Sequence, residues 1–411
     1  MRRTLRRCLL GTLMIVAAAL AGWGAPAAWR SHGTGMVSAQ ESTRPVSSSL
    51  PSVLGSVFVI VMENQNWSSI KGSADAPYIN GTLLTTGAHA EQYFNPPSMH
   101  PSEPNYIWLE AGSNLGITTD YDPTSNHQST TNHLVTLLQN TGVSWKAYAE
   151  GISGATCPLT STGNYAPRHV PFLYFDDVTG ANNPNSTYCV QHVRPYSELS
   201  GDLRNNAVPR YVFIAPDLCD DMHNACAPLN NQVRQGDTWL AQQLPQIFQS
   251  AAYQHGGVVF ITWDEGQGSD GPIGLIALSP YARSGYAGAL HYTHSSLLRT
   301  IEETLGVTPL LGDAANASDL GDLFSAAPTS ARVTRFTVRR HGSTIRFRWS
   351  LAHHNLLAGF AVYAAGHRLN RRAIPIHSAI QYRYQAHWTG RGPFRLAVIL
   401  WNGREITVAG R

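Results

Sequence analysis

Short, uninterrupted apolar runs constrain the fold of this chain more than any other feature of its sequence. The clearest of them are Val57–Met62 (VFVIVM), Tyr211–Ala215 (YVFIA), Val258–Trp263 (VVFITW) and Leu275–Leu278 (LIAL). Segments with helical patterns alternate with these runs, which is the order typical of an α/β fold with a largely buried sheet. The sequence therefore predicts one α/β domain over residues 53–325.

Two helices of this domain are indicated by their patterns. Gln232–Phe248 carries a mixed apolar stripe. His294–Leu305 follows Thr293, a residue suited to an N-cap, and it stops at Gly306.

The N-terminus has the composition of an export signal. Four arginines precede an apolar run from about Cys8 to Ala21, and Val37-Ser38-Ala39 offers a small-residue cleavage site. We interpret residues 1–39 as a secretory signal peptide and residues 40–52, which are rich in Ser, Thr and Pro, as a flexible lead-in. The sequence thus predicts a secreted, extracellular protein. An uncleaved membrane anchor is the alternative, but the apolar run is short for a membrane span.

Cysteine usage agrees with export. Of the five cysteines, four remain once Cys8 leaves with the signal: Cys157, Cys189, Cys219 and Cys226. An even number in an exported chain predicts two disulfides, for which three pairings exist. We favour Cys157 with Cys189 and Cys219 with Cys226, because the second pair closes a short loop. A zinc site is the competing interpretation, although no C-x-x-C is present.

Charge is distributed unevenly along the chain. From Ala331 to Arg411 there are fourteen arginines, no lysine and a single acid, Glu405, a net charge of +13 within an overall +3. Residues 326–332 have the composition of a linker, and alternating runs in residues 333–411, such as Ile345–Trp349 and Phe394–Leu400, predict a small antiparallel β-sandwich. The asymmetry favours two domains with different purposes.

Polar residues follow three of the apolar runs directly. Glu63 and Asn64 follow the first run, Asp217 follows the second, and Asp264 and Glu265 follow the third. In open α/β sheets, ligands bind beyond the carboxyl ends of the strands. Oxygen ligands for a divalent metal are therefore expected to meet there. Ordinary turn polarity explains any one of these pairs equally well.

Ser102 is the candidate nucleophile. It lies in His100-Pro101-Ser102-Glu103-Pro104, and Pro104 suits the first turn of a helix that runs to about Gly112. The free N–H groups at a helix start favour a phosphoryl group and an ionised serine oxygen. The alternative is that Ser102 only caps the helix. No serine lies in G-x-S-x-G, which weakens an esterase of the α/β-hydrolase type.

Several stretches together resemble a known family. They are VFVIVMENQNW, HPSEPNYIWLEAG, WKAYAEG, YAPRHVPFLYF, FIAPDLCDDMHN, ITWDEG and HYTHSSLLRTIEETLG. In this order they are similar to the phosphoesterase family of bacterial and fungal acid phosphatases and phospholipases C, part of the alkaline phosphatase superfamily. The resemblance implies a three-layer, alkaline-phosphatase-like α/β sandwich.

The resemblance also implies site residues. It assigns one divalent metal ion to Glu63, Asn64, Ser102, Asp264 and Glu265, with Ser102 as nucleophile, and it places His169 and His223 at the phosphate or its leaving group. Because the E-N and D-E pairs are dominated by oxygen, we expect calcium, magnesium or manganese rather than zinc. The second-tier candidates are His100, His127, His291 and His294.

The predicted activity is that of a secreted metal-dependent phosphomonoesterase, acid phosphatase-like, that hydrolyses phosphate esters through a phosphoserine intermediate. Two alternatives stay open: a phospholipase C-type phosphodiesterase, and an inactive surface-binding protein that acts through its basic module. That module is faintly similar to a fibronectin type III domain. Its arginines favour an anionic lipid or cell-wall polymer as partner rather than a specific nucleic acid, or they serve only to keep it soluble.

Overall fold

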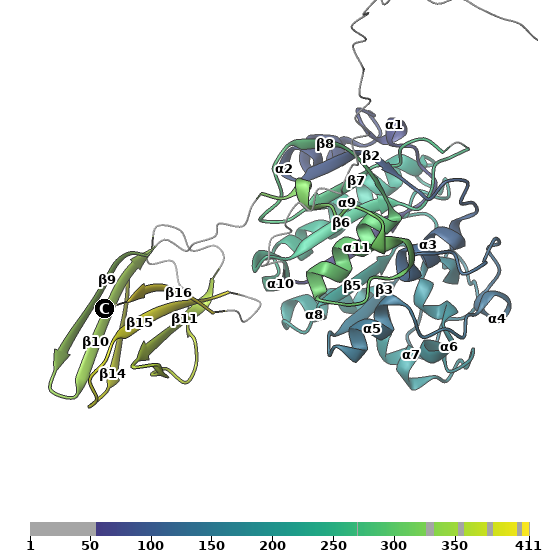
Figure 1. Cartoon of the computed structure of the whole chain (residues 1–411). Coiled ribbons are helices and arrows are strands. Elements are labelled where there is room, and N and C mark those ends of the chain that lie inside the picture. Colours follow the sequence, from purple (N-terminus) through teal and green to yellow (C-terminus); the bar gives the residue numbers. More distant parts are fainter. Residues whose placement is uncertain are drawn as a thin grey trace, which may run out of the picture. The chain divides into compact units, whose positions relative to one another are not determined.

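A computed structural model of the chain describes residues 55–268, 270–325, 333–351, 357–375, 381–400 and 405–410 (Figure 1). The predicted signal peptide, lead-in and linker lie outside the described residues. No helix in the described part of the chain is long and apolar enough to cross a membrane.

A mixed eight-stranded sheet forms the centre of the first part of the chain. Its strand order is β4-β3-β5-β1-β6-β7-β2-β8, and β7 runs against its neighbours. The strands are β1 (Val57–Met62), β2 (Ala88–Phe94), β3 (Trp145–Ala149), β4 (Val193–Pro195), β5 (Tyr211–Ala215), β6 (Val258–Trp263), β7 (Leu275–Leu278) and β8 (Tyr286–Thr293). All four predicted apolar runs are confirmed as strands of this sheet.

The central strands consist almost entirely of apolar residues, because both faces of the sheet are covered there. Every residue of β1, β5, β6 and β7 is buried. β1 pairs in parallel with β5 on one side and with β6 on the other, and Ile60 lies opposite Ile214 and Ile261. These three strands therefore end at the same edge of the sheet.

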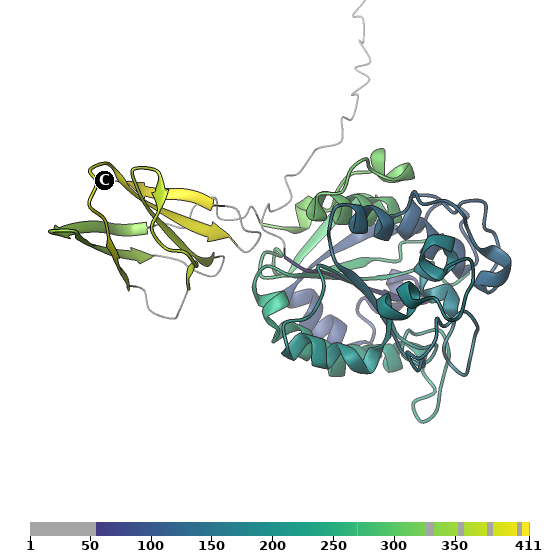
Figure 2. The ribbon, with the colours of Figure 1, turned by 90° about the horizontal axis from the view of Figure 1, so that it is seen from below.

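Helices cover the sheet on both faces and complete three layers (Figure 2). Contacts join α11 to α3 and α3 to α5, and a second group joins α9 to α8 and α10. The helices are α1 (Trp67–Ile70), α2 (Leu84–Thr86), α3 (Ser102–Ala111), α4 (Pro123–Asn126), α5 (Leu134–Asn140), α6 (Asp176–Thr179), α7 (Thr187–His192), α8 (Leu199–Arg204), α9 (Gln232–Phe248), α10 (Ala251–Gln254) and α11 (His294–Leu305). The predicted α9 and α11 are confirmed. The α/β class is confirmed as well.

Antiparallel sheets form the C-terminal part, as predicted. One has the order β14-β10-β9 and the other the order β12-β11-β15-β16, with β13 paired to β11. The strands are β9 (Val333–His341), β10 (Thr344–Leu351), β11 (Leu357–Ala364), β12 (His367–Arg368), β13 (Ile374–Pro375), β14 (Gln381–His387), β15 (Phe394–Leu400) and β16 (Glu405–Gly410). The two sheets meet through Trp349 against Phe360 and Phe347 against Phe394. The fibronectin type III assignment stays a prediction.

Two disulfides join the cysteines in the favoured pairing, Cys157 with Cys189 and Cys219 with Cys226. The second one closes the loop that follows β5. This loop carries Asp221 and His223 back toward the edge of the sheet at which β1 and β6 end, because the backbone N–H of Glu63 donates to the Asp221 carbonyl at 2.7 Å.

Candidate active site

Glu63 lies at the centre of the site, directly after β1, and it is fully buried. The hydroxyl of Ser102 donates to its Oε2 at 2.9 Å, and the hydroxyl of Tyr106 donates to its Oε1 at 2.7 Å. Both donors belong to α3, which begins at Ser102, so residues four apart reach the same carboxylate from one face of the helix. The predicted start of this helix at Ser102 is confirmed.

The N-terminus of α3 is fixed by further hydrogen bonds. The Asn105 side chain donates to the Met99 carbonyl at 3.0 Å and to Glu265 Oε2 at 3.1 Å. The backbone N–H of Glu103 donates to Asp120 Oδ1 at 2.9 Å, which satisfies one of the N–H groups left free at a helix start. Ser102 therefore has a fixed position between the carboxylates that follow β1 and β6.

Asn64 connects these two carboxylates. Its backbone N–H donates to Asp264 Oδ1 at 2.9 Å and its side chain donates to Glu63 Oε2 at 2.7 Å. The backbone φ of Asn64 is 48°, a left-handed conformation that asparagine tolerates better than most residues. Asparagine therefore suits this position for two reasons: it tolerates the left-handed backbone, and its side chain donates to Glu63.

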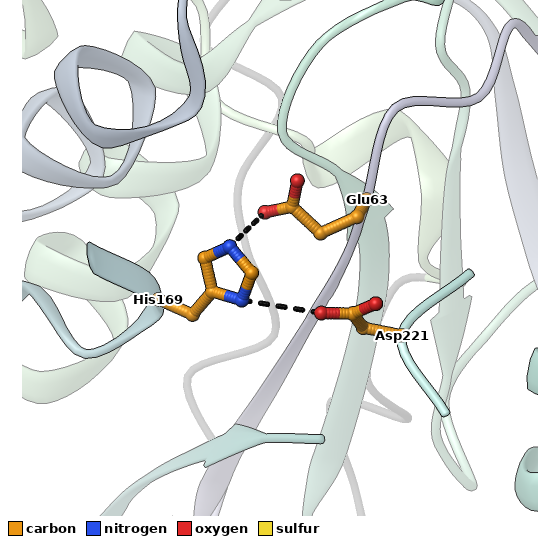
Figure 3. A group of neighbouring side chains, drawn as sticks. All are labelled: Glu63, His169 and Asp221. Carbon is orange, nitrogen blue, oxygen red and sulfur yellow. Dashed lines mark ion pairs between the residues drawn. The ribbon is translucent and has the colours of Figure 1, made fainter. Parts of the chain in front are cut away.

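The buried ring of His169 lies between the carboxylates of Glu63 and Asp221 (Figure 3). Its Nε2 is 2.9 Å from Glu63 Oε1 and its Nδ1 is 3.1 Å from Asp221 Oδ2, while Tyr106 stacks on the ring at 5.1 Å. Burial opposes the charge on His169, but the two carboxylates more than offset it and raise the pKa to about 9. Burial also opposes the charge on Glu63, but His169 and the hydrogen bonds lower its pKa to about 2.

The pKa values of Asp264 and Glu265 are raised, whereas that of Glu63 is lowered. Burial, together with the nearby charges of Glu63 and Glu265, raises the pKa of Asp264 well above its usual value. Burial also raises the pKa of Glu265 to about 7, although His100 lies 2.7 Å away. Among the described residues, buried Asp264 Oδ2 has no hydrogen-bond partner. The side of the site that follows β6 is therefore short of positive charge.

A pocket of about 670 Å³ lies beside this part of the site, and Glu63, Ser102 and Asp264 are not among its lining residues. Asn64, His100, His223 and Glu265 line it, and so does the loop 266–270 apart from residue 269, which is not described. His100 bridges the pocket wall, with Nε2 at 2.8 Å from Asp270 Oδ1. His223 thus reaches the cavity, whereas His169 lies behind it and their ring centroids are 6.4 Å apart.

The other second-tier histidines lie elsewhere. His294 is buried behind the site, where its Nε2 is 2.7 Å from the Asp264 carbonyl and burial lowers its pKa to about 4. His127 pairs with Asp176, and His291 is exposed and packs on Phe94. Of the four, only His100 lines the pocket.

Sequence reasoning missed the roles of Asp221 and Tyr106 in this cluster and pointed instead to Asp217. Asp217 forms a second group with Glu150 and Asp220, and its Oδ1 accepts from the N–H groups of the turn that follows it. Asp221 could have been found, because it precedes His223 by two residues within the loop closed by Cys219 and Cys226.

Besides the group of Glu150, Asp217 and Asp220, two arrangements of the described residues could hold a cation. Glu63, His169 and Asp221 offer ligand atoms within 4.8 Å of one another, but here His169 already supplies a positive charge. The predicted oxygen ligands include Asp264 with its unpartnered Oδ2, so a divalent cation fits that set better. The fold and the site together define an α/β enzyme with a buried serine facing several carboxylates.

Comparison with known proteins supplies the family. A family model described as "Phosphoesterase family" matches residues 72–308, more than half of the chain. The chain belongs to the phosphoesterase family, which confirms the resemblance, and it is a phosphoric ester hydrolase.

Curated relatives carry related names. The chain is 29% identical over 279 residues to a phosphatidylinositol-3-phosphatase of Mycobacterium tuberculosis, which covers 68% of this chain and 85% of that protein. It is 24% identical to a probable acid phosphatase of Kluyveromyces lactis over 60% of this chain and 56% of that protein, so it spans about half of this relative. Among solved structures, the chain is similar to a protein of the alkaline phosphatase superfamily from Vibrio parahaemolyticus. The two chains are 10% identical with a TM-score of 0.47, and the match covers 74% of this chain and 78% of that one.

Proposed function

We propose that this chain is a secreted, metal-dependent phosphomonoesterase, acid phosphatase-like, with Ser102 as its nucleophile. The observation that carries the proposal is the hydrogen bond from Ser102 Oγ to Glu63 Oε2 at the first residue of α3. A serine whose proton is drawn toward a carboxylate is a better nucleophile, and the N-terminus of a helix stabilises an anion next to it.

The reaction proceeds in two displacements. Ser102 Oγ forms a bond to phosphorus while the bond from phosphorus to the leaving oxygen breaks, which gives a phosphoseryl enzyme and an alcohol. Water then attacks phosphorus, the bond to Oγ breaks, and inorganic phosphate leaves. Because the Glu103 N–H already donates to Asp120 and Pro104 has no N–H, it is the positive end of the α3 dipole that offsets charge on the phosphoryl oxygens in both steps.

Glu63, Asn64, Ser102, Asp264 and Glu265 would hold the metal ion. Their oxygen atoms favour calcium, magnesium or manganese over zinc. When bound, such a cation supplies charge that ionises a serine hydroxyl and neutralises phosphoryl oxygens. Independently of the cation, Asn64 orients Glu63 and Asp264 toward each other through its two hydrogen bonds.

Histidines complete the proposed site. His223 lines the pocket and is proposed to contact the phosphate or the leaving group. His169 is proposed for the same region, and its buried contacts with Glu63 and Asp221 add a positioning role for the carboxylate that accepts from Ser102.

A monoester is the preferred substrate class. The relatives named above are phosphatases, and one of them bears a name that specifies a phosphorylated lipid headgroup. A phospholipase C-type phosphodiesterase remains the second candidate within the family. An inactive surface-binding protein is less consistent with the chain, since Glu63, Ser102 and Asp264 are all present and close together.

Export is supported by the two disulfides, because such bonds persist in oxidising compartments. The basic C-terminal sheets are proposed to bring the enzyme to an anionic lipid or cell-wall polymer.

The first prediction tests the nucleophile. Ser102→Ala should lower turnover of a soluble phosphomonoester by at least about a thousandfold, because no other hydroxyl replaces the attacking oxygen. The matched control is Ser113→Ala, a serine just beyond the other end of α3, which should keep full turnover. Acid-quenched protein should carry one phosphoryl group on the peptide that contains Ser102. Normal turnover by a folded Ser102→Ala protein would refute the proposed chemistry, and faster cleavage of phosphatidylcholine than of the monoester would favour the diesterase.

The second prediction concerns the metal. Exhaustive chelation should abolish turnover, and calcium, magnesium or manganese should restore it better than zinc does. Binding is also visible without activity: ligand at a hundred times its Kd stabilises the folded state by about 2.7 kcal/mol. The added ion should therefore raise the melting temperature of the native chain but not that of Asp264→Asn. Full activity after chelation would contradict this role.

A further inference from the structure

The three-stranded sheet β14-β10-β9 has one apolar face and one basic face. Along β10, Ile345, Phe347 and Trp349 are buried, while Arg346 and Arg348 between them are exposed. Because side chains alternate across a strand, the exposed residues of all three strands lie on the same outward face.

This outward face, here called the arginine face, carries five arginines. Arg335 and Arg339 come from β9, Arg346 and Arg348 from β10, and Arg383 from β14, and all five are exposed. Its other members are polar and lack acids: Thr337, His341, Thr344, Ser350, Gln381, Gln385 and His387.

The pairing register places like charges directly opposite each other. Arg346 lies opposite Arg339 on one neighbouring strand, and Arg348 lies opposite Arg383 on the other. Directly opposed residues have Cβ atoms only about 4.5–5.5 Å apart, and like charges at that spacing destabilise a sheet. Among the described residues, no acidic side chain forms an ion pair with any of the five arginines of this face.

Two other arginines of the same module have partners within it. Arg368 lies 3.0 Å from Glu405, and Arg340 donates to the carbonyls of Trp388 and Gly390. Solubility alone requires charge but not its concentration on one sheet face. An external anion would offset the repulsion within the arginine face.

We infer that the arginine face binds the surface of an anionic phospholipid bilayer. The guanidinium groups spread over three strands in two dimensions, which matches a plane of phosphate headgroups better than a single extended polymer. Arginine also matches the geometry of phosphate oxygens. The face presents no Phe, Tyr or Trp ring on which nucleic acid bases could stack, its rings being those of His341 and His387, and no exposed apolar side chain for insertion, so the contact is electrostatic. The inference refines the proposed role of the C-terminal sheets and is independent of the chemistry proposed for Ser102.

The test uses the full chain and co-sedimentation with vesicles. Phosphatidylcholine vesicles that contain phosphatidylglycerol should bind the protein, and pure phosphatidylcholine vesicles should not. The variant Arg346→Gln, Arg348→Gln, Arg383→Gln should bind roughly a hundredfold more weakly, since each surface arginine contributes about fivefold. The matched control, Arg371→Gln, Arg372→Gln, Arg391→Gln, removes the same charge from exposed loops of the module and should weaken binding only a few-fold.

Both triple variants should show the native circular dichroism spectrum, which verifies that the C-terminal sheets are folded, and native turnover of a soluble monoester, which verifies the α/β part. Equal weakening by the two triples would overturn the inference, because net charge alone would then explain binding. Tighter, face-dependent binding to an anionic wall polymer or to duplex DNA than to the vesicles would also overturn it. Lack of phosphatase activity in a chain that still binds vesicles through this face would refute the proposed function and leave this inference standing.

Discussion

Glu63 shows how much of the site depends on one buried side chain. One of its oxygens accepts from Ser102 and Asn64, and the other accepts from Tyr106 and lies beside His169. A buried carboxylate is stable only when its charge is compensated, and these four partners provide that compensation. The same contacts fix the direction in which the Ser102 hydroxyl donates.

Another buried histidine leads to a prediction about pH and stability. His133 lies between Glu110 Oε1 at 2.8 Å and Asp177 Oδ1 at 3.0 Å, and it is fully buried. Burial opposes its charge, but these carboxylates raise its pKa to about 9. A raised histidine pKa stabilises the fold fully below the unfolded value of about 6.5 and less as pH rises to 9. The expected loss is at most about 1.4 kcal/mol per pH unit in that window.

Chemical denaturation between pH 6 and pH 10 would check this expectation. His133→Asn should be less stable than the native chain at pH 6, and the difference should shrink as pH rises through 9. His291→Asn, which alters an exposed histidine, serves as the control and should follow the native curve. A constant difference between His133→Asn and the native chain would show that the charge of His133 contributes nothing.

At the residue scale, the sequence located the ligand candidates that follow strands but not the contacts between them. Glu63, Asp264 and Glu265 were recognisable because each directly follows an apolar run. Tyr106 could not be recognised in this way, since a tyrosine inside a helix is ordinarily a core residue. Asp221 was passed over in favour of Asp217, because only the path of the loop decides which of the two faces Glu63.

Among the elements, the loop closed by the Cys219–Cys226 disulfide supplies two side chains of the candidate site. It carries Asp221, which contacts His169, and His223, which lines the pocket. Met222 between them has a φ of 80°, a conformation that is unfavourable for a residue with a side chain. The disulfide therefore holds a loop that would otherwise relax.

We predict that loss of Cys157–Cys189 lowers the stability of the protein more, whereas loss of Cys219–Cys226 lowers its turnover more. From sequence separations of 7 and 32 residues, loss of Cys219–Cys226 should cost about 2.4 kcal/mol of stability, and loss of Cys157–Cys189 about 3.7 kcal/mol. Turnover should nevertheless fall more in the Cys219→Ser, Cys226→Ser protein, because Asp221 and His223 lose their fixed positions. Urea denaturation and monoester kinetics on both double variants, assayed well below their unfolding midpoints, would measure this. If turnover follows stability in both variants, the loop has no special role in the site.

Strands could be predicted from the sequence where their apolar residues form an uninterrupted run. The strands β1, β5, β6 and β7 are buried along their whole length, so their apolar runs are uninterrupted. β8 alternates irregularly between exposed and buried residues, and β4 spans three residues, so neither has a clear period. Their places in the sheet depend on pairing with distant strands, which a local pattern does not contain.

For the whole molecule, charge and chemistry occupy different parts of the chain. The match to the phosphoesterase family ends at residue 308, before the segment with fourteen arginines and one acid begins at residue 331. All proposed site residues lie between Glu63 and Glu265, within the first of these parts. The predicted linker, residues 326–332, follows the point at which the chain leaves the α/β part.

The last prediction is therefore that a chain ending at Ser325 keeps its catalytic activity but loses its attraction to anionic surfaces. Ser325 is a suitable end, because its N–H donates to the Tyr281 carbonyl and Phe324 forms a bridge with Ala282, so the last residues remain tied to the α/β part. Its turnover of a soluble monoester should stay within about twofold of the full chain, since removed surface charge alters distant, screened charges only weakly.

Two measurements on the full and shortened chains separate the outcomes. Turnover of a soluble monoester reports the site, and the rate on a phosphorylated lipid in anionic vesicles reports delivery to a surface. The advantage of the full chain on vesicles should shrink as added salt shortens the Debye length from about 10 Å at 0.1 M to about 3 Å at 1 M. A folded shortened chain that fails on the soluble ester would place the C-terminal sheets in the catalytic site. Equal rates on vesicles at low salt would instead mean that the fourteen arginines act only as solubilising surface.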